Sequence, residues 1–248
     1  MTAAFDAILF DADGVLQATD EKWFYAMTAL IGTDEEEQVE RFFGDIMAAE
    51  LSSLAGHRPF EGPLGEVLVR WSVMKPAAEV LRLWHHVEVD RDVIAAVREL
   101  RAGGVRCALA TNQHPERAAY MRENLGYHEV FDDLFYSCDL GVAEPHPAYF
   151  SEAVCRVGTE PGRTLLLDDN RNNVAGAKEA GLMAELFAST AGGRSWTASS
   201  RRAPDSREPP AYPKELTYPC CRQALGELGE VSPREGPVAK STRSADDR

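Results

Sequence analysis

The stretch "AILFDADGVL", residues 7–16, decides the fold of this chain. Its apolar beginning, Ala7 to Phe10, is typical of a buried strand, and this strand ends abruptly at two acids, Asp11 and Asp13. Two carboxylates at the mouth of a buried strand repel each other, and their burial is unfavourable without a partner. The pattern therefore indicates that the two acids serve a purpose other than folding.

Apolar runs predict five buried strands, and helical patterns lie between the later ones. The predicted strands are 5–10, 105–110, 134–138, 164–168 and 182–187. The predicted helices are 91–102, which follows a capping residue at Asp90, and then 115–125, 147–157 and 171–180. Strands that alternate with helices imply an α/β fold, a Rossmann-like parallel sheet with helices on both faces.

Residues 17–89 differ from the rest because they hold no clear strand. Their pattern predicts helices instead, at about 20–31, 34–50, 61–73 and 76–86. A segment of this length is too long for a simple crossover between two strands. We therefore predict an inserted helical cap domain at 17–89 and a core formed by 1–16 and 90–188.

The composition changes from about residue 189, where the chain becomes rich in Gly, Ser, Pro and Arg. Such a segment buries too little apolar surface to offset the entropy lost on ordering. We predict that 189–248 is a largely disordered, low-complexity tail. A short helix at 214–228 is an option that Pro219 weakens.

The overall composition argues against several classes of protein. The formal net charge of −14 is unlike that of a nucleic-acid-binding protein, which needs a basic surface. No apolar run approaches the roughly 18 residues of a membrane span, and the N-terminus lacks the basic region of a signal peptide. The five cysteines, an odd number without C-x-x-C spacing, favour a reduced, cytoplasmic protein. The oligomeric state cannot be read from the sequence.

Three of the predicted strands end in polar clusters: Asp11 with Asp13, Thr111 with Asn112, and Asp168 with Asp169. The carboxyl ends of parallel strands form one rim where ligands bind, so we expect the clusters to converge. Carboxylates that lie this close repel unless a cation joins them, and such hard oxygen ligands suit Mg²⁺. Each cluster alone is compatible with a turn or a helix cap, and it is their joint occurrence that favours a metal site.

These motifs resemble those of the haloacid-dehalogenase-like (HAD) hydrolases. "FDADGVL", residues 10–16, is similar to the first family motif, Asp-x-Asp-Gly-[Val/Thr]-Leu. "LATN" at 109–112 resembles the second motif, and "LLLDDNRNNVAGAKEAGL" at 165–182 resembles the fourth, an acidic pair followed by a helix. The helical insert at 17–89 lies where this family inserts its cap. The resemblance spans about residues 5–187 and leaves the tail outside.

The resemblance implies a Mg²⁺-dependent phosphomonoester hydrolase that acts on a small phosphorylated metabolite. Asp11 would be the nucleophile and form an aspartyl-phosphate. Asp13 would protonate the leaving oxygen and then take a proton from the hydrolytic water. Because the dehalogenases of the family lack an acid at the position of Asp13, the phosphatase branch is favoured.

The resemblance also implies a set of ligands for the metal and the phosphate. Mg²⁺ would be bound by the Asp11 carboxylate, the Asp13 backbone carbonyl and Asp169, with Asp168 close by or acting through water. The phosphoryl oxygens would be held by the Thr111 hydroxyl and the Asn112 amide. These donors would stabilise the charge of the transferring group, which is most of what phosphoryl transfer needs.

The third family motif is where this chain departs from the pattern. The family runs Gly-x-x-Lys-Pro-Asp-Pro, and this chain has "GVAEPHP" at 141–147, with Glu144 at the lysine position. The lysine helps a phosphate dianion to lie beside an ionised nucleophile, and a glutamate has the opposite effect. Three alternatives would relieve the unfavourable charge of Glu144: its side chain turns outward, its carboxyl group becomes neutral, or another cation compensates its charge. The candidates for that cation are His114, His146, Arg117, Arg171 and Lys178.

Three functions are compatible with these sequence features. The leading hypothesis is the metal-dependent phosphatase, with residues 17–89 choosing the substrate. The alternative is a catalytically impaired relative that keeps the fold and binds Mg²⁺ or another ligand. A third hypothesis is an interaction protein that acts through residues 189–248, where the sequence holds no convincing linear motif.

Overall fold

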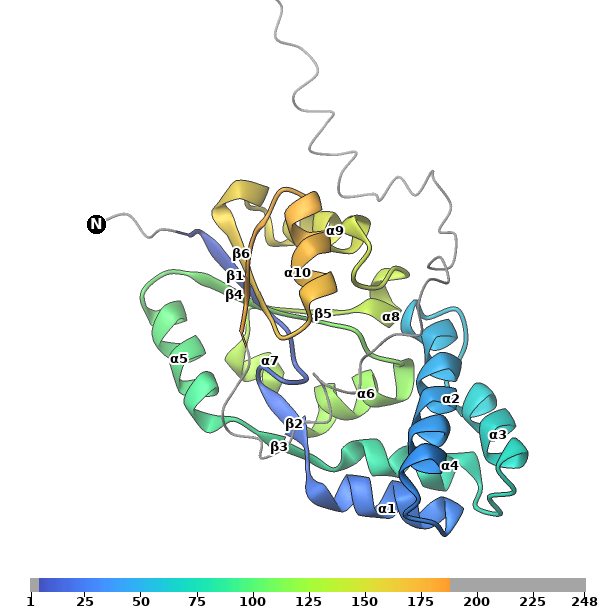
Figure 1. The fold of residues 1–248 in the computed structure, drawn as a ribbon. Helices are drawn as coiled ribbons and strands as arrows, with labels where there is room; N and C mark the ends of the chain where they lie inside the picture. Colours follow the sequence, from blue (N-terminus) through green and yellow to red (C-terminus); the bar gives the residue numbers. More distant parts are fainter. Residues whose placement is uncertain (1–4, 188–248) are drawn as a thin grey trace, which may run out of the picture. The chain divides into compact units, whose positions relative to one another are not determined.

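The computed structural model describes residues 5–187, and at its centre lies a five-stranded sheet whose strands all run parallel (Figure 1). The strand order is β5-β4-β1-β6-β7. The strands are β1 Ala7–Phe10, β4 Arg106–Thr111, β5 Asp133–Tyr136, β6 Thr164–Asp168 and β7 Met183–Leu186. β1 is buried along its whole length, as expected for the central strand of a parallel sheet. The carboxyl ends of β4, β1 and β6 are therefore neighbours.

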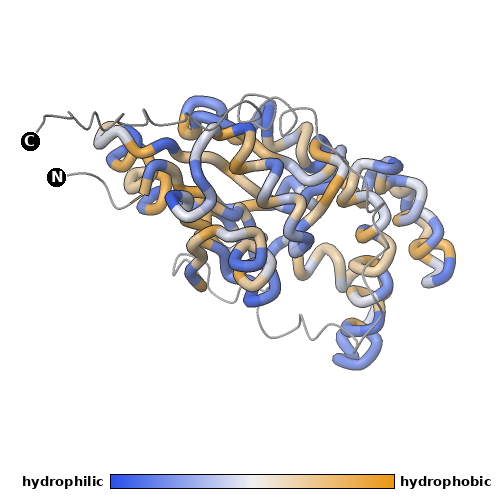
Figure 2. The backbone as a smooth tube through the Cα atoms, turned by 90° about the horizontal axis from the view of Figure 1, so that it is seen from above, coloured by the Kyte–Doolittle hydropathy of each residue, from blue (hydrophilic) through white to orange (hydrophobic). Residues whose placement is uncertain are grey.

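Helices cover both faces of this sheet (Figure 1). One face packs against α5 (Arg91–Ala102), α6 (Pro115–Asn124) and α7 (Tyr127–Val130), with Ile8, Phe10, Cys107 and Leu109 in the shared core. The other face packs against α9 (Pro147–Val157) and α10 (Arg171–Glu179). The short helices α8 (Ser137–Leu140) and η2 (Pro161–Arg163) lie in the connections. Figure 2 shows apolar and polar stretches alternating along the helices, as expected when a helix buries one face.

Local signals in the sequence explain where several helices begin. Asp90 caps α5, and its Oδ1 accepts hydrogen bonds from the backbone N–H groups of Asp92 and Val93 at 2.9 and 3.2 Å. Pro115 and Pro147 occupy the first turns of α6 and α9, where a missing N–H does no harm. These helices fall where the sequence predicted them.

Residues 17–89, called the cap segment below, build a hydrophobic cluster of their own. The chain enters and leaves it through an antiparallel ribbon of β2 (Gln17–Thr19) and β3 (Val87–Val89). Between these strands lie α1 (Glu21–Ile31), α2 (Glu36–Leu54), α3 (Glu61–Arg70), α4 (Ala77–Val80) and η1 (Leu81–His85). Trp23, Phe42, Phe43, Phe60 and Trp84 are among the buried residues of this cluster. The described residues all belong to one compact unit, and their division into cap and core stays a prediction.

The sequence predicted the five strands of the sheet, and it was wrong in several details. Residues 17–89 do contain two strands, β2 and β3, which are too short to give a periodic pattern in the sequence. The predicted strand 134–138 ends at Tyr136, since Ser137 begins α8. The predicted helix 76–86 is the short α4 continued by the 3-10 helix η1.

Two further predictions concern the C-terminal tail and the absence of a membrane span. The predicted tail at 189–248 and its helix at 214–228 lie outside the described residues. Within residues 5–187, no helix is both long enough and apolar enough to cross a membrane.

Candidate active site

Three carboxylates meet where the neighbouring strands β1 and β6 end. Asp11 directly follows β1, Asp168 is the last residue of β6, and Asp169 comes next. Each offers an oxygen that lies within 4.8 Å of the others. Asp11 and Asp168 are buried, with 5% and 0% of their surface exposed. The sequence grouped these three residues from their strand ends, and the sheet brings them together.

The turn after β1 is shaped so that Asp169 can approach it. Gly14 has a φ of +87°, in the left-handed region that favours glycine. A Cβ atom at this position would lie 2.2 Å from Asp169 Oδ2, so the carboxylate has its place only because Gly14 lacks a side chain. The Ala12 carbonyl closes the turn by accepting hydrogen bonds from the N–H groups of Val15, Leu16 and Gln17.

Asp11 lies in surroundings that oppose its ionisation. Burial raises its pKa well above the usual range, and the charges of Asp168, Asp13 and Asp169 raise it further, whereas a hydrogen bond from Thr111 lowers it. A cation among the carboxylates would relieve this repulsion, because it favours their ionised forms. The donor set and its charge therefore fit a hard divalent metal ion.

Thr111 ends β4 beside the acids, as the second motif predicted. It is 1% exposed, and its Oγ1 accepts a hydrogen bond from Gln113 Nε2 at 3.2 Å. The same Nε2 donates to Asp13 Oδ2 at 3.0 Å. Gln113 thus links the Thr111 hydroxyl to the second acid of the first motif, and the sequence analysis had not singled it out.

Asn112 is bonded to the loop of the third motif. Its Nδ2 donates to the Glu144 carbonyl at 3.0 Å, and its Oδ1 accepts from the Glu144 N–H at 2.9 Å. Both polar atoms of the side chain are engaged in this reciprocal pair. A contact of Asn112 with a phosphoryl oxygen would therefore come from its backbone N–H or from the second proton of Nδ2.

Glu144, at the lysine position of the third motif, does not turn outward. It is 6% exposed, and its Oε2 accepts a hydrogen bond from Asn173 Nδ2 at 3.1 Å. The same Nδ2 donates to Asp168 Oδ2 at 3.0 Å, so one amide group bridges the two acids. A Cβ atom at Gly176 would lie 1.9 Å from the Pro145 carbonyl oxygen, so glycine allows α10 to approach this loop. The loop thus brings a further acid to the cluster.

Asp13 pairs with a cation on α6. Arg117 Nη1 donates to Asp13 Oδ2 at 2.9 Å, and Nη2 donates to Oδ1 at 2.8 Å. Gln17 and Gln113 each donate a hydrogen bond from Nε2 to this carboxylate at 3.0 Å. Arg117 was one of five candidate cations, but its partner was not foreseen because 104 residues separate it from Asp13. Only the folded chain brings the two together.

The other candidate cations have different surroundings. His146 caps α9, and its Nδ1 accepts a hydrogen bond from the Ala148 N–H at 3.1 Å. Arg171 and Lys178 are exposed on α10. His114 is 1% exposed, and its ring lies 4.8 Å from that of Phe60 in the cap segment.

The cap segment contacts the core beside the site through α6. Glu116 accepts hydrogen bonds from the backbone N–H groups of Phe60 and Glu61, both at 3.2 Å, at the start of α3. His114 Nδ1 lies 3.0 Å from Glu116 Oε2. Burial alone would raise the pKa of Glu116, but hydrogen bonds to His114 and the backbone outweigh it and lower the pKa to about 2.

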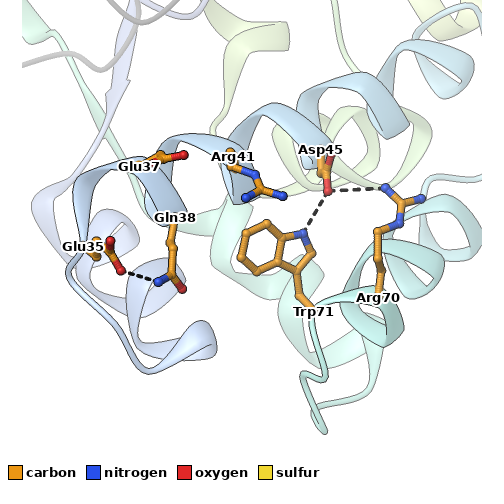
Figure 3. A pocket seen from close by; sticks show the side chains of 7 residues that line it. All are labelled: Glu35, Glu37, Gln38, Arg41, Asp45, Arg70 and Trp71. Atoms are coloured by element: carbon orange, nitrogen blue, oxygen red, sulfur yellow. Dashed lines mark hydrogen bonds and ion pairs between the residues drawn. The ribbon is translucent and has the colours of Figure 1, made fainter.

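A separate hollow of about 480 Å³ lies on the cap segment between α2 and α3 (Figure 3). Asp45 accepts a hydrogen bond from Trp71 Nε1 at 2.9 Å and pairs with Arg70 at 3.3 Å inside it. The remaining lining residues are Glu35, Glu37, Gln38 and Arg41. None of the predicted site residues lines this hollow, so it is separate from the strand-end cluster.

A family model and several known proteins are similar to this chain. Residues 5–181 match the model of the haloacid dehalogenase-like hydrolases, and the chain belongs to this family. It is 23% identical over 199 residues to the pyrophosphatase PpaX of Bacillus cereus (strain AH820), which covers 77% of this chain and 87% of that enzyme. It is 29% identical over 93 residues to the glyceraldehyde 3-phosphate phosphatase of Methanopyrus kandleri, which covers 37% of this chain and only 40% of that enzyme.

A solved structure shares the fold. The HAD family enzyme BT-2542 of Bacteroides thetaiotaomicron, in complex with magnesium and inorganic phosphate, has a TM-score of 0.60 to this chain. The two are 18% identical, and the match covers 73% of this chain and 93% of the other. The family expected from the sequence motifs is therefore confirmed, together with its α/β fold.

Proposed function

We propose that this chain is a Mg²⁺-dependent hydrolase of small phosphomonoesters that works through an aspartyl-phosphate on Asp11. The observation that carries the proposal is the meeting of Asp11, Asp168 and Asp169, whose oxygens lie within 4.8 Å of one another. Carboxylates this close fit a hard divalent cation bound together with a phosphate group. The likeness to a HAD enzyme solved with magnesium and inorganic phosphate supports the same chemistry.

The proposed metal ligands are the Asp11 and Asp169 carboxylates and the Asp13 backbone carbonyl, with Asp168 close by or acting through water. When bound, Mg²⁺ offsets the carboxylate charges and stabilises the charge of a transferring phosphoryl group. The close approach of Asp169 to Gly14 supports this ligand set, because it brings the fourth motif against the first.

Each side chain of the site has its own role in the proposed reaction. Asp11 attacks phosphorus with a carboxylate oxygen, and the bond from phosphorus to the leaving oxygen breaks. Asp13 gives a proton to the leaving oxygen and takes one from the water that hydrolyses the aspartyl-phosphate. The Thr111 hydroxyl and the Asn112 backbone N–H hold phosphoryl oxygens. The guanidinium of Arg117 stabilises the ionised carboxylate of Asp13, so it favours the second proton transfer and opposes the first.

An assay with p-nitrophenyl phosphate tests the proposal. We expect turnover with Mg²⁺, loss of turnover in excess EDTA, and a fall of roughly 10³-fold or more in kcat for Asp11→Asn. Asp34→Asn, at an exposed acid of the cap segment, is the matched control and should keep the native rate. Turnover that survives EDTA or the loss of the Asp11 carboxylate would contradict the proposal.

A second candidate function is that of a catalytically impaired relative, and the burial of Glu144 favours it. Two unit charges ~4 Å apart interact by about 4 kcal/mol at an effective dielectric constant near 20. An ionised Glu144 in place of a lysine would therefore lower the rate by several decades, at 1.36 kcal/mol for each tenfold, whereas a neutral Glu144 would cost only the loss of the lysine. This relative would bind Mg²⁺ without turning over p-nitrophenyl phosphate, which separates it from the active enzyme.

For the substrate we propose a class of compounds and not a single compound. Two relatives carry the names pyrophosphatase and glyceraldehyde 3-phosphate phosphatase, which supports a small phosphorylated substrate. We assign the choice among such compounds to residues 17–89, and a panel of phosphorylated metabolites tests it. We also propose a cytoplasmic location, on the cysteine pattern of the sequence.

A further inference from the structure

The Asp13 carboxylate is held by side chains from three other parts of the chain. Its Oδ1 accepts from Arg117 Nη2 at 2.8 Å and from Gln17 Nε2 at 3.0 Å. Its Oδ2 accepts from Arg117 Nη1 at 2.9 Å and from Gln113 Nε2 at 3.0 Å. A planar guanidinium that binds both oxygens fixes the direction of a carboxylate as well as its position.

The groups that hold Asp13 are themselves fixed. Arg117, Gln17 and Gln113 are buried, with 7%, 2% and 1% of their surface exposed. Gln17 Oε1 accepts a hydrogen bond from the Tyr127 hydroxyl at 2.8 Å, which orients its amide. The amide of Gln113 is oriented by Thr111 Oγ1 at 3.2 Å. The network therefore has the rigidity that a positioned catalytic group needs.

Asp13 also lies next to a set of acids that would attract it to a metal ion. Asp13 is only two residues from Asp11 in the sequence. Its carboxylate is nevertheless not part of the cluster whose oxygens lie within 4.8 Å of one another, which consists of Asp11, Asp168 and Asp169. A cation bound by those three would draw a further carboxylate toward itself. A carboxylate that becomes a metal ligand is lost for proton transfer to the leaving group and from water.

We propose that Arg117 is a positioning residue that keeps the Asp13 carboxylate out of the metal ligand set and beside the nucleophile. This inference rests on the proposed function. Arg117 does so by competing with the metal for both oxygens of Asp13. Its positive charge also reaches the site from α6, whereas the family's third-motif lysine would reach it from the loop that here carries Glu144.

Arg117→Gln tests the proposal in the absence of substrate. The variant removes a positive charge and frees the Asp13 carboxylate, so we expect Mg²⁺ to bind roughly tenfold more tightly by isothermal titration calorimetry. We also expect the electron paramagnetic resonance spectrum of bound Mn²⁺ to change as its ligand set changes. With p-nitrophenyl phosphate, kcat should fall at least tenfold while KM stays within about twofold.

A double-mutant cycle shows whether Arg117 acts through Asp13. In the Asp13→Asn background, the Arg117→Gln change should tighten Mg²⁺ binding much less and leave the Mn²⁺ spectrum almost unaltered, because the competing carboxylate is gone and only the effect of the lost charge remains. Arg122→Gln is the matched control, since it breaks another ion pair of α6, with Asp139, and should leave both metal readouts native. If Arg117→Gln tightened Mg²⁺ binding equally in the native and the Asp13→Asn backgrounds, the proposal would be overturned.

Two further outcomes are decisive. If Arg117→Gln folds but keeps native Mg²⁺ affinity, the Mn²⁺ spectrum and kcat, the proposal is wrong. If Arg117→Gln does not fold, Arg117→Lys takes its place, because one ammonium group holds the carboxylate less firmly, and native metal readouts there overturn the proposal. If neither the native chain nor any variant hydrolyses a phosphate ester, the proposed function fails, while the metal measurements still decide the role of Arg117.

Discussion

At the scale of single residues, the close contact between Gly14 and Asp169 is the feature that most directly shapes the candidate metal site. Gly14→Ala places a Cβ atom 2.2 Å from Asp169 Oδ2 on a backbone with a φ of +87°. We expect Mg²⁺ affinity to fall at least roughly tenfold because the carboxylate must move. Stability should fall by about 1–2 kcal/mol because an L side chain is strained at this φ. Calorimetric Mg²⁺ titration and urea unfolding measure the two effects.

Gly104 offers a matched control for this change. Its φ is +88°, and a Cβ atom there would meet nothing within 4 Å. Gly104→Ala should therefore lose similar stability while it keeps native Mg²⁺ affinity. Equal Mg²⁺ affinity in the two variants would show that Asp169 is not a ligand of the metal.

Glu144 is the residue on which the level of activity depends. Glu144→Lys restores the charge that the family carries at this position, and we expect kcat/KM for p-nitrophenyl phosphate to rise by roughly 10²-fold or more. Glu144→Gln, which removes the negative charge without adding a positive one, should give an intermediate gain. A loss of existing activity in Glu144→Lys would mean that the glutamate has been wrongly interpreted as unfavourable.

At the scale of helices and strands, the contact between α6 and the start of α3 joins the cap segment to the core. Phe60, the N-cap of α3, makes no side-chain cap, and Glu116 of α6 accepts the first N–H groups in its place. Loss of such a cap typically lowers stability by about 1 kcal/mol. We expect Glu116→Gln to lower the free energy of unfolding by at least about 1 kcal/mol in urea titrations at neutral pH, because the ionised carboxylate adds to the effect of the cap.

The pH dependence of this contact has a defined sign. The pKa of Glu116 is lowered from 4.5 to about 2 in the folded chain, so its stabilisation is complete above pH 4.5 and is lost as the pH falls toward 2. The difference in unfolding free energy between native protein and Glu116→Gln should shrink over that range. Glu123→Gln, at an exposed acid of the same helix, is the control for the loss of a carboxylate outside this contact. A difference that stays constant down to pH 2 would exclude Glu116 as the cap of α3.

The same scale shows what the sequence could predict. β1 and β6 were found because each is a continuous apolar run that ends at acids, and α5 was found from Asp90 and its helical period. β2 and β3 were missed because a strand of three residues is too short to show a readable alternation. β2 and β3 are strands because they pair with each other. Partners that lie far apart in the chain are not visible in a local sequence pattern.

At the scale of the whole molecule, the site is assembled from residues that only the sheet topology makes neighbours. Asp11, Thr111 and Asp168 could be predicted because each ends a strand, and parallel strands end at one rim. The bond between Arg117 and Asp13 could not, because it spans 104 residues between a turn and a helix face. Side-chain partners of this kind depend on the relative placement of elements, which strand and helix patterns leave open.

The central claim is that Asp11, within the cluster of three carboxylates, takes up the phosphoryl group. Trapping the intermediate tests it most directly: the protein is mixed with Mg²⁺ and ³²P-labelled acetyl phosphate, quenched in acid, and digested for peptide mapping. We predict label on the peptide that contains Asp11, and none without Mg²⁺ or in Asp11→Asn. Label on a different residue, or unchanged labelling in Asp11→Asn, would contradict the claim.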